Sequence, residues 1–128
     1  MANNPFHNKN KNVFQSFEKA YAGFLFIAKH HKHFRTELLL ALCAIFLGFE
    51  LTLSRGEWLA LILAINIGLI SEIFNTGIEE ICNLITRDHH ISIKIIKDVA
   101  GSAVFLSALF SYIIGLIIFI PKVIALIK

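Results

Sequence analysis

The chain has 128 residues, of which 56% are hydrophobic, and its mean hydropathy is +0.70. A soluble domain of this size seldom carries so much apolar sequence, so we expect an integral membrane protein with one small domain. The net charge of +3 would suit a nucleic-acid-binding protein. The charges cluster beside apolar segments, however, as membrane topology requires, and we expect no nucleic-acid partner.

The N-terminal quarter contains a polar segment and then an amphipathic one. Residues 1–12 are rich in Asn and Lys and have nothing to bury, so we expect them to be disordered. In residues 13–33, apolar side chains recur every three or four positions between lysines and a glutamate, which predicts an amphipathic helix. This helix is too polar to cross a bilayer, and we expect it to lie on the membrane surface.

Three apolar segments follow, each long enough to cross the hydrocarbon core of a bilayer, which takes about 20 residues. The predicted spans are residues 34–53, 58–86 and 99–120. A polar connection, residues 86–98, is expected between the second and third spans. The predicted fold class is therefore an all-α membrane protein with a surface helix and three transmembrane helices, in which residues 13–128 form one membrane-embedded domain.

A short turn joins the first two spans. Its sequence is Ser54-Arg55-Gly56-Glu57, and Gly56 is a residue that interrupts helices. Ser54 followed three residues later by Glu57 matches a capping box, in which each side chain satisfies a backbone N–H of the other residue. The pattern predicts that the second long helix begins here, just before the interfacial Trp58.

A stripe of polar side chains runs along the end of the second span. Glu72, Asn75, Thr76, Glu79 and Asn83 fall within roughly 80° of one another on a helix. A carboxylate at membrane depth costs at least ~2.5 kcal/mol, so Glu72 and Glu79 need a partner, a cation or water. We interpret the stripe as a catalytic or cation-binding seam. The alternative is a helix end that has already left the lipid.

The distribution of Lys and Arg predicts the orientation. Nine of the 12 cationic residues precede the first span, stand at its start or lie between the second and third spans. Because cytoplasmic loops carry an excess of Lys and Arg, we expect this side to be cytoplasmic, with the N-terminus on it. The end of the polar stripe faces the same side, where ATP is available.

These residue types suit transfer of a phosphoryl group to a lipid alcohol. A carboxylate such as Glu72 at the lipid boundary can accept a proton from a hydroxyl. A second carboxylate, Glu79, can bind Mg²⁺, which often bridges one or two carboxylates to phosphates. Lys97 beside Asp98 suits phosphate and base contacts. The phosphate-binding pattern GxxxxGK[ST] is absent, so these residues are compatible with a lipid kinase without requiring one.

The same residues resemble a known family. The pattern from Glu72 to Glu79, followed by Lys97-Asp98 and set within three spans, is similar to the small bacterial family of prokaryotic-type diacylglycerol kinases and undecaprenol kinases. The resemblance implies ATP-dependent phosphorylation of undecaprenol or diacylglycerol at the cytoplasmic face of the bacterial cytoplasmic (inner) membrane. It also implies a homotrimer, with ATP as cosubstrate and Mg²⁺ as cofactor.

The resemblance also implies roles for single residues. Glu72 matches the general base that acts on the lipid hydroxyl, and Glu79 matches the residue that binds the metal of Mg-ATP. His31 stands where the family has its second metal-binding glutamate, so it is the other candidate metal ligand. The expected ATP-binding residues are Asn75, Glu79, Asp88, His89, His90, Lys97 and Asp98.

Two departures from the family pattern leave an alternative open. His31 replaces a glutamate and Asn83 replaces an aspartate, and histidine suits softer ions than Mg²⁺. The alternative function is a catalytically weakened or non-enzymatic membrane protein of the same fold, acting in lipid binding or as a scaffold. Between the two acceptors, the turn from Ser54 to Trp58 and the segment before Phe34-Arg35 favour undecaprenol.

Overall fold

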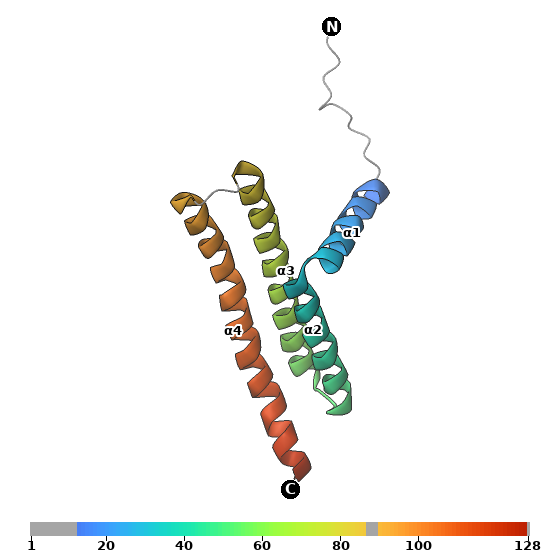
Figure 1. Ribbon diagram of the computed structural model, residues 1–128. Helices are drawn as coiled ribbons and strands as arrows, with labels where there is room; N and C mark the ends of the chain where they lie inside the picture. The colour runs from blue at the N-terminus through green and yellow to red at the C-terminus, as the bar shows by residue number, and fades with distance from the viewer. Residues whose placement is uncertain (1–12, 87–89, 128) are drawn as a thin grey trace.

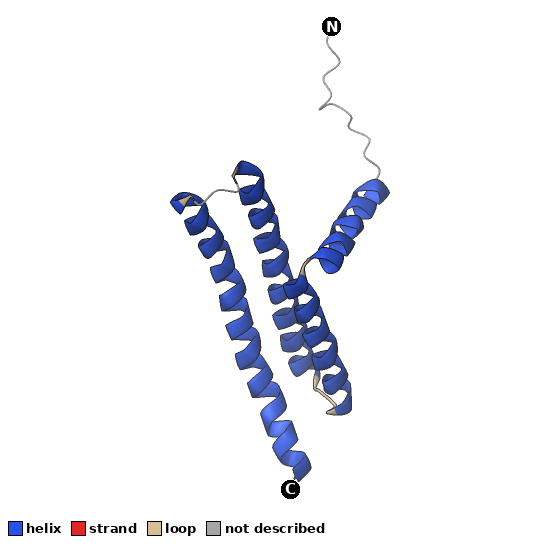
Figure 2. Ribbon diagram, viewed as in Figure 1, coloured by secondary structure: helices blue, strands red, loops and turns tan. Residues whose placement is uncertain are grey.

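The structure is a computed structural model that describes residues 13–86 and 90–127, nearly all of them helical (Figures 1 and 2). The all-α prediction is confirmed for this part of the chain, which contains no strand. The helices are α1 (Val13–His30), α2 (Lys32–Glu50), α3 (Arg55–Ile85) and α4 (Ile91–Ile127).

Helices α2, α3 and α4 run side by side, each antiparallel to the next along the chain (Figure 1). The end of α3 and the start of α4 therefore lie together at the upper end of the bundle in Figure 1, whereas α2 begins lower, beside the middle of α3. Helix α1 leaves the bundle at the start of α2 and packs mainly against α2. The fully buried Phe34 anchors this contact, with its ring centroid 5.5 Å from that of Phe24.

The predicted capping box at the start of α3 is confirmed. Glu57 N donates to Ser54 Oγ over 3.3 Å, and Ser54 N donates to Glu57 Oε2 over 2.7 Å. Lys122 of α4 reaches this turn, with Nζ 3.1 Å from Glu57 Oε2 and 3.4 Å from the carbonyl oxygen of Thr52. The lower end of the bundle is therefore held by a polar clamp between the α2–α3 turn and α4.

The observed helix boundaries differ from the predicted ones in three places. The amphipathic helix ends at His30 rather than residue 33, because His31 adopts an extended conformation (φ −108°, ψ 112°) between α1 and α2. Helix α4 begins at Ile91, so most of the expected connection 86–98 is helical. Isoleucines at four-residue spacing, such as Ile91 and Ile95, give this segment an apolar side and extend the helix.

Helix α4 also continues past Pro121 to Ile127, where the sequence predicted an end. Proline removes one backbone hydrogen bond and usually kinks or ends a helix. Helices in membrane proteins tolerate this loss where neighbouring groups satisfy the freed carbonyl. Lys122, directly after Pro121, contacts Glu57, so this part of α4 lies against the α2–α3 turn.

The compact core lies at the lower end of the bundle. Leu53, Leu61 and Ile118 form its buried cluster, and Trp58 packs against it. Gly48 allows this packing, because a Cβ there would lie 2.8 Å from Trp58 Cη2. The core is thus built around the α2–α3 turn.

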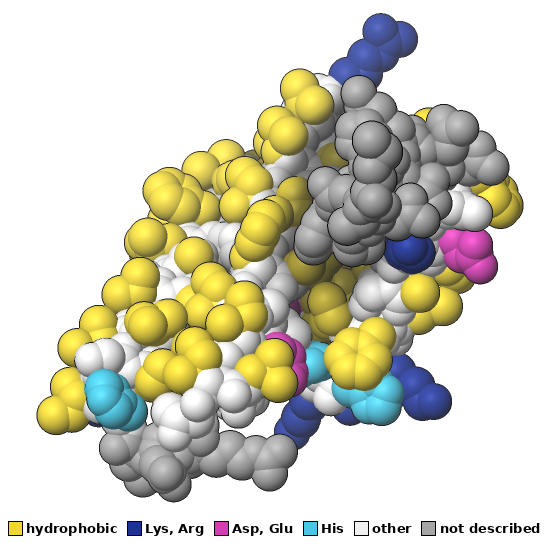
Figure 3. Space-filling model, turned by 90° about the horizontal axis from the view of Figure 1, so that it is seen from above, with side chains coloured by type: hydrophobic (Ala, Val, Ile, Leu, Met, Phe, Trp, Pro, Cys, Tyr) yellow, Lys and Arg dark blue, Asp and Glu magenta, His cyan; other side chains and the backbone are white. Residues whose placement is uncertain are grey.

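Most large apolar side chains elsewhere lie on the surface (Figure 3). Within the described residues, α3 and α4 are long and apolar enough to cross a membrane. At 1.5 Å per residue they are about 46 and 55 Å long, against ~30 Å for the hydrocarbon core. The predicted first span, in α2, does not meet the same test. The 19 residues of α2 include four charged ones, Lys32, Arg35, Glu37 and Glu50.

Candidate active site

The polar stripe predicted on the second span lies in the upper half of α3. Glu72 and Thr76 are buried, with 6% and 4% of their surface exposed. Asn75 and Glu79 are half-buried, and Asn75 Nδ2 donates to Glu79 Oε1 over 3.4 Å. Asn83, one turn beyond Glu79, is exposed. The stripe therefore runs from a buried carboxylate to an exposed amide at the upper end of the bundle.

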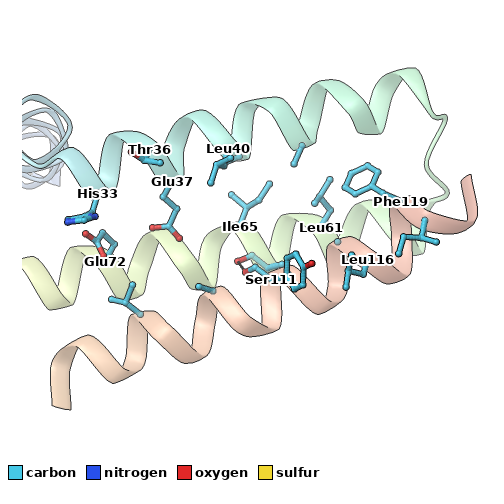
Figure 4. A pocket seen from close by; sticks show the side chains of 18 residues that line it. His33, Thr36, Glu37, Leu40, Leu61, Ile65, Glu72, Ser111, Leu116 and Phe119 are labelled. Carbon is cyan, nitrogen blue, oxygen red and sulfur yellow. Dashed lines mark hydrogen bonds between the residues drawn. The ribbon is translucent and has the colours of Figure 1, made fainter. Parts of the chain in front are cut away.

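A pocket of about 640 Å³ lies between α2, α3 and α4 (Figure 4). Glu72 lines it from α3, and His33 and Glu37 line it from α2. Figure 4 shows these three side chains pointing into the space between the two helices at the same end of the pocket. The buried carboxylate of Glu72 therefore opens into a cavity rather than into packed side chains.

Glu37 reaches this position because α3 has a glycine opposite it. A Cβ at Gly68 would collide with Glu37 Oε1 and would lie 3.3 Å from Glu37 Cδ. Gly68 and Glu72 are four residues apart, so they occupy neighbouring positions on one face of α3, ~5–6 Å apart. The carboxyl groups of Glu37 and Glu72 thus face the pocket within one helical turn of each other, and they interact electrostatically.

Sequence reasoning missed Glu37 as a member of the site and placed it only at the start of the first span. The contact depends on how α2 packs against α3, which helical periodicity within either segment does not specify. A weak signal was present. Gly68 stands one turn before Glu72 on the stripe, and an interior glycine often marks a close approach by another group.

Asn75 carries an unsatisfied acceptor. Its Oδ1 is buried and has no hydrogen-bond partner among the described residues, although its Nδ2 is bonded to Glu79. A buried polar atom without a partner costs about 1–3 kcal/mol. Such an atom is a candidate for contact with a ligand that supplies a donor or a cation.

The donor set around Asn75 and Glu79 fits Mg²⁺. Hard cations prefer oxygen ligands, and Mg²⁺ is often held by one or two carboxylates together with substrate phosphates. Glu79 offers a carboxylate and Asn75 Oδ1 an amide oxygen. The described residues contain no group of three or more His, Cys, Asp or Glu placed to hold a metal ion alone. The arrangement therefore suits a metal that arrives with phosphates.

His31, the other candidate metal ligand, lies beside Glu80 rather than being buried in the stripe. Its Nε2 is 4.0 Å from Glu80 Oε1, and the two side chains are 22% and 55% exposed. The contact is an ion pair only when His31 is protonated. His31, at the α1–α2 junction, thus contacts α3 through Glu80, the residue next to Glu79.

Lys97 and Asp98 lie in the second turn of α4, on a helix rather than in the expected loop. Lys97 Nζ donates to Asn83 Oδ1 over 2.8 Å and so links α4 to the end of the stripe. Asp98 and His90 are exposed at the same end of α4. The predicted ATP-binding residues Asp88 and His89 lie outside the described residues.

The two halves of this site differ in chemistry. The Glu37–Glu72 half adjoins an apolar pocket, where a carboxylate can accept a proton from a hydroxyl of an apolar molecule. The half formed by Asn75, Glu79 and Lys97 lies one to two turns nearer the end of the bundle and can hold a cation and anionic oxygens. From Glu72 to Glu79 the rise is ~10 Å. The arrangement suits transfer between a lipid and a charged donor.

Comparisons with known proteins support the same kind of reaction. The family described as Prokaryotic diacylglycerol kinase matches residues 18–119. The undecaprenol kinase of Bacillus subtilis (strain 168) is 39% identical over 116 residues, which cover 90% of this chain and 94% of that protein. The diacylglycerol kinase of Synechocystis sp. is 28% identical over 116 residues, 90% of this chain and 66% of that protein.

Proposed function

The chain belongs to the prokaryotic diacylglycerol kinase family and is a lipid kinase, and we propose that it transfers the γ-phosphoryl group of ATP to the hydroxyl of undecaprenol or diacylglycerol at the cytoplasmic membrane face. The observation that carries the proposal is the buried Glu72, which opens into an apolar pocket one to two turns from the oxygen-rich end of the stripe. A lipid hydroxyl and a nucleotide phosphate can meet between these two regions.

On the acceptor side, Glu72 accepts the proton of the lipid hydroxyl. The hydroxyl oxygen forms a bond to the γ-phosphorus while the bond from that phosphorus to the bridging β–γ oxygen breaks, and ADP leaves. Burial excludes water from Glu72, which limits hydrolysis of ATP. Glu37 faces Glu72 across the mouth of the pocket and restricts where the hydroxyl can lie.

On the nucleotide side, Glu79 and Asn75 Oδ1 would hold Mg²⁺, which when bound would supply positive charge to offset that of the phosphates. The ammonium of Lys97, held by Asn83 at 2.8 Å, contacts the phosphates. Asp98 and His90, together with Asp88 and His89, contact the rest of the nucleotide. His31 is a further metal ligand in this proposal, contributed from the α1–α2 junction.

The proposed membrane arrangement has three spans. Helix α2 packs along α3 and is about 28 Å long, close to the ~30 Å core. Its outer surface is apolar, with exposed Leu39, Leu42 and Phe46. Helix α1, whose exposed side chains include Phe14 and Phe17, lies on the cytoplasmic surface of the inner membrane, and the N-terminus is cytoplasmic.

We further propose a homotrimer as the functional assembly. The span in α4 is only 11% buried within one chain, so most of its apolar surface is available to lipid or to other copies. Between the two acceptors, the undecaprenol kinase of Bacillus subtilis is more similar to this chain than is the diacylglycerol kinase of Synechocystis. This difference favours undecaprenol.

The first test is transfer of labelled phosphate from ATP by the purified protein in lipid bilayers with Mg²⁺. Undecaprenol and diacylglycerol are offered in parallel. Glu72→Gln removes the proton acceptor while preserving size, and we expect a loss of at least about a hundredfold in rate, the lower range for general-base catalysis.

Glu50→Gln is the matched control, since Glu50 is exposed at the far end of α2, and it should retain wild-type activity. Wild-type activity in Glu72→Gln would contradict the assignment of the base. Absence of transfer by the wild type with Mg²⁺, Mn²⁺ and Zn²⁺ would instead favour the non-enzymatic alternative.

A further inference from the structure

The pocket beside Glu72 has one polar end and a mainly apolar remainder, in which Ser111 and Tyr112 are polar lining residues. His33, Thr36, Glu37 and Glu72 line the polar end. Figure 4 shows the labelled side chains distributed along the helices from His33 at this end to Phe119 at the other. The apolar lining residues include Leu40, Leu61, Ile65, Leu116 and Phe119. This distribution matches a molecule with one polar head and a hydrocarbon tail.

The register of α3 and α4 gives the length of the pocket. Ser111 Oγ donates to the carbonyl oxygen of Ala64 over 3.2 Å. Because the helices are antiparallel, Val104, seven residues before Ser111, lies beside the level of Glu72, about seven residues after Ala64. Gly115 then lies ~16 Å from Val104 along α4, and the lining residue Ile120 lies ~24 Å from it.

This length exceeds one leaflet of a membrane. Half of the hydrocarbon core is ~15 Å thick, so a pocket that starts at the cytoplasmic boundary and extends ~24 Å passes the midplane. The acyl chains of diacylglycerol are about one leaflet long and diverge from a single glycerol. A polyprenol has a single unbranched run of isoprene units that is much longer than a leaflet. The pocket therefore matches the polyprenol better in both length and number of chains.

We propose that the pocket receives the single isoprenoid tail of a long polyprenol, whose hydroxyl lies between Glu37 and Glu72, and that Gly115 keeps its path open beyond the membrane midplane. This inference rests on the proposed kinase function and adds a specificity-determining position to it. By the register of Ser111 and Ala64, Ile120 lies level with Arg55, so the pocket reaches the outer end of the proposed span in α3.

A helix from a second copy of the chain is the other possible occupant. Such a helix would place apolar side chains against two carboxyl groups, Glu37 and Glu72, at the polar end of the pocket. It would also block access of the acceptor to Glu72. A lipid with a terminal hydroxyl satisfies the carboxyl groups and uses the apolar part at the same time, so we assign the pocket to the lipid.

Gly115 is suited to a direct test. A Cβ there meets no atom within 4 Å, so a larger side chain enters open space rather than packed structure. Gly115 lines the pocket beyond the midplane, level with Ala60 of α3 by the register of Ser111 and Ala64. Glycine is also a poor helix former, so Gly115→Leu should not destabilise α4. The variant therefore obstructs the pocket and leaves the fold intact.

The experiment compares undecaprenol with the short prenol farnesol as acceptors. For Gly115→Leu, we expect the KM for undecaprenol to rise about tenfold, which corresponds to ~1.4 kcal/mol of lost binding. The KM for farnesol and the KM for ATP should not change, because the farnesol tail ends before Gly115. Ala125→Leu is the control, an exposed position on α4 outside the pocket, and it should behave as the wild type with both acceptors.

A second readout does not depend on turnover. The thermal midpoint of the purified protein is measured with and without each prenol, and undecaprenol should stabilise the wild type more than it stabilises Gly115→Leu. Transfer to a lipid by the wild type, with equal effects of Gly115→Leu on both prenols or on neither, overturns this inference and leaves the proposed function standing. A higher kcat/KM for diacylglycerol than for undecaprenol in the wild type would also overturn this inference and leave the proposed function standing.

The oligomeric state of each variant distinguishes a lipid in the pocket from a helix of a second copy. If Gly115→Leu dissociates the assembly and lowers activity with all acceptors, the pocket is an interface between copies and the inference is wrong. If the wild type transfers phosphate to no acceptor, the proposed function fails. The thermal shift then still decides whether the pocket selects long tails.

Discussion

The two carboxyl groups at the mouth of the pocket depend on one glycine. Glu37 lies against Gly68, one turn before Glu72, so the position of its carboxyl group is determined by the missing side chain. Two carboxylates that share a partly buried site repel each other unless a proton, a cation or a hydroxyl lies between them. The pair is therefore better suited to contact a ligand than to stabilise the fold.

Gly68→Ala should separate activity from stability. The new Cβ displaces the Glu37 carboxyl group, and misplacement of a site group by about 1 Å can cost up to ~100-fold in rate. Replacing an interior helical glycine with alanine favours the helix by ~0.5–1 kcal/mol. We therefore expect activity to fall by roughly tenfold or more while the thermal midpoint is unchanged or higher, as measured by initial rates and thermal unfolding in detergent.

Gly77→Ala is the control for this experiment. Gly77 lies on the same helix, is exposed, and has no atom within 4 Å of a Cβ. Gly77→Ala should change the thermal midpoint about as much as Gly68→Ala does, and it should keep wild-type activity. A Gly68→Ala variant as active as Gly77→Ala would show that the position of Glu37 does not affect the reaction.

Periodicity was sufficient to predict which residues of α3 share the stripe, because all of them belong to one helix. It could not predict that Glu37 joins Glu72 or that Lys97 bonds Asn83, since both contacts join different helices. The roles of the predicted site residues stay predictions. Asp88 and His89 lie outside the described residues.

At the scale of helices, the clamp at the lower end links α4 to the α2–α3 turn. Glu57 precedes the proposed span that begins at Trp58. The pKa of Glu57 is lowered from its usual 4.5, first by the hydrogen bond from Ser54 N, then by Ser54 Oγ and by Lys122. A lowered pKa in the folded state means that the contact stabilises the fold above the unfolded pKa. This stabilisation is lost as the pH falls through the folded pKa.

The expected consequence is a small acid-dependent loss of stability at this turn. At pH 7 and low salt, Glu57→Gln should unfold at a slightly lower temperature than the wild type, since exposed ion pairs contribute little. At a pH well below the lowered pKa of Glu57 the difference should shrink, because the wild-type carboxyl group is then uncharged, like the glutamine side chain. Thermal unfolding at both pH values measures this, with Glu50→Gln as the control. An undiminished difference at low pH would contradict the linkage to Glu57 ionisation.

Local signals predicted some helix ends and missed others. The start of α3 was predictable because Ser54 and Glu57 satisfy each other within one turn. The start of α4 was not, because the residues before Asp98 are polar enough to resemble a connection. The effect of Pro121 was misjudged, since the next residue, Lys122, is fixed by contacts 65 and 70 positions away.

At the scale of the whole molecule, the surface is mostly apolar and the described cations lie mainly toward one end. Among residues 13–86 and 90–127, eight apolar residues are buried, while many large ones are exposed. A fold with so little internal core depends on lipid or on other copies to cover its helices. The proposed orientation places the N-terminus and the start of α4 in the cytoplasm and the α2–α3 turn outside.

Single cysteines can check this orientation. In a variant lacking Cys43 and Cys82, Arg55→Cys should react with a membrane-impermeant maleimide added to intact spheroplasts. Ser92→Cys, in the first turn of α4, should react only after the membrane is permeabilised. Both positions are exposed, so accessibility depends on the membrane side. Labelling of both positions from the same side would rule out the proposed span in α3.

Composition and charge predicted the all-α class, which the structure confirms for the described residues, and the motif resemblance predicted the lipid kinase family, which the comparisons confirm. The first predicted span, in α2, and the homotrimer stay predictions. Both depend on surroundings that a single chain lacks. The apolar surface of α2 and α4 is compatible with lipid or with another copy, and composition alone does not distinguish them.

The core cluster of Leu53, Leu61 and Ile118 lies at the opposite end of the bundle from the stripe, with Leu61 ~16 Å from Glu72 along α3. Substitutions around Glu37 and Glu72 can therefore accumulate without weakening the packing that holds the helices together. A lineage with this architecture can change how it binds the hydroxyl end of an acceptor in small steps, because each intermediate still folds. The separation of packing from chemistry makes the fold tolerant of evolutionary change.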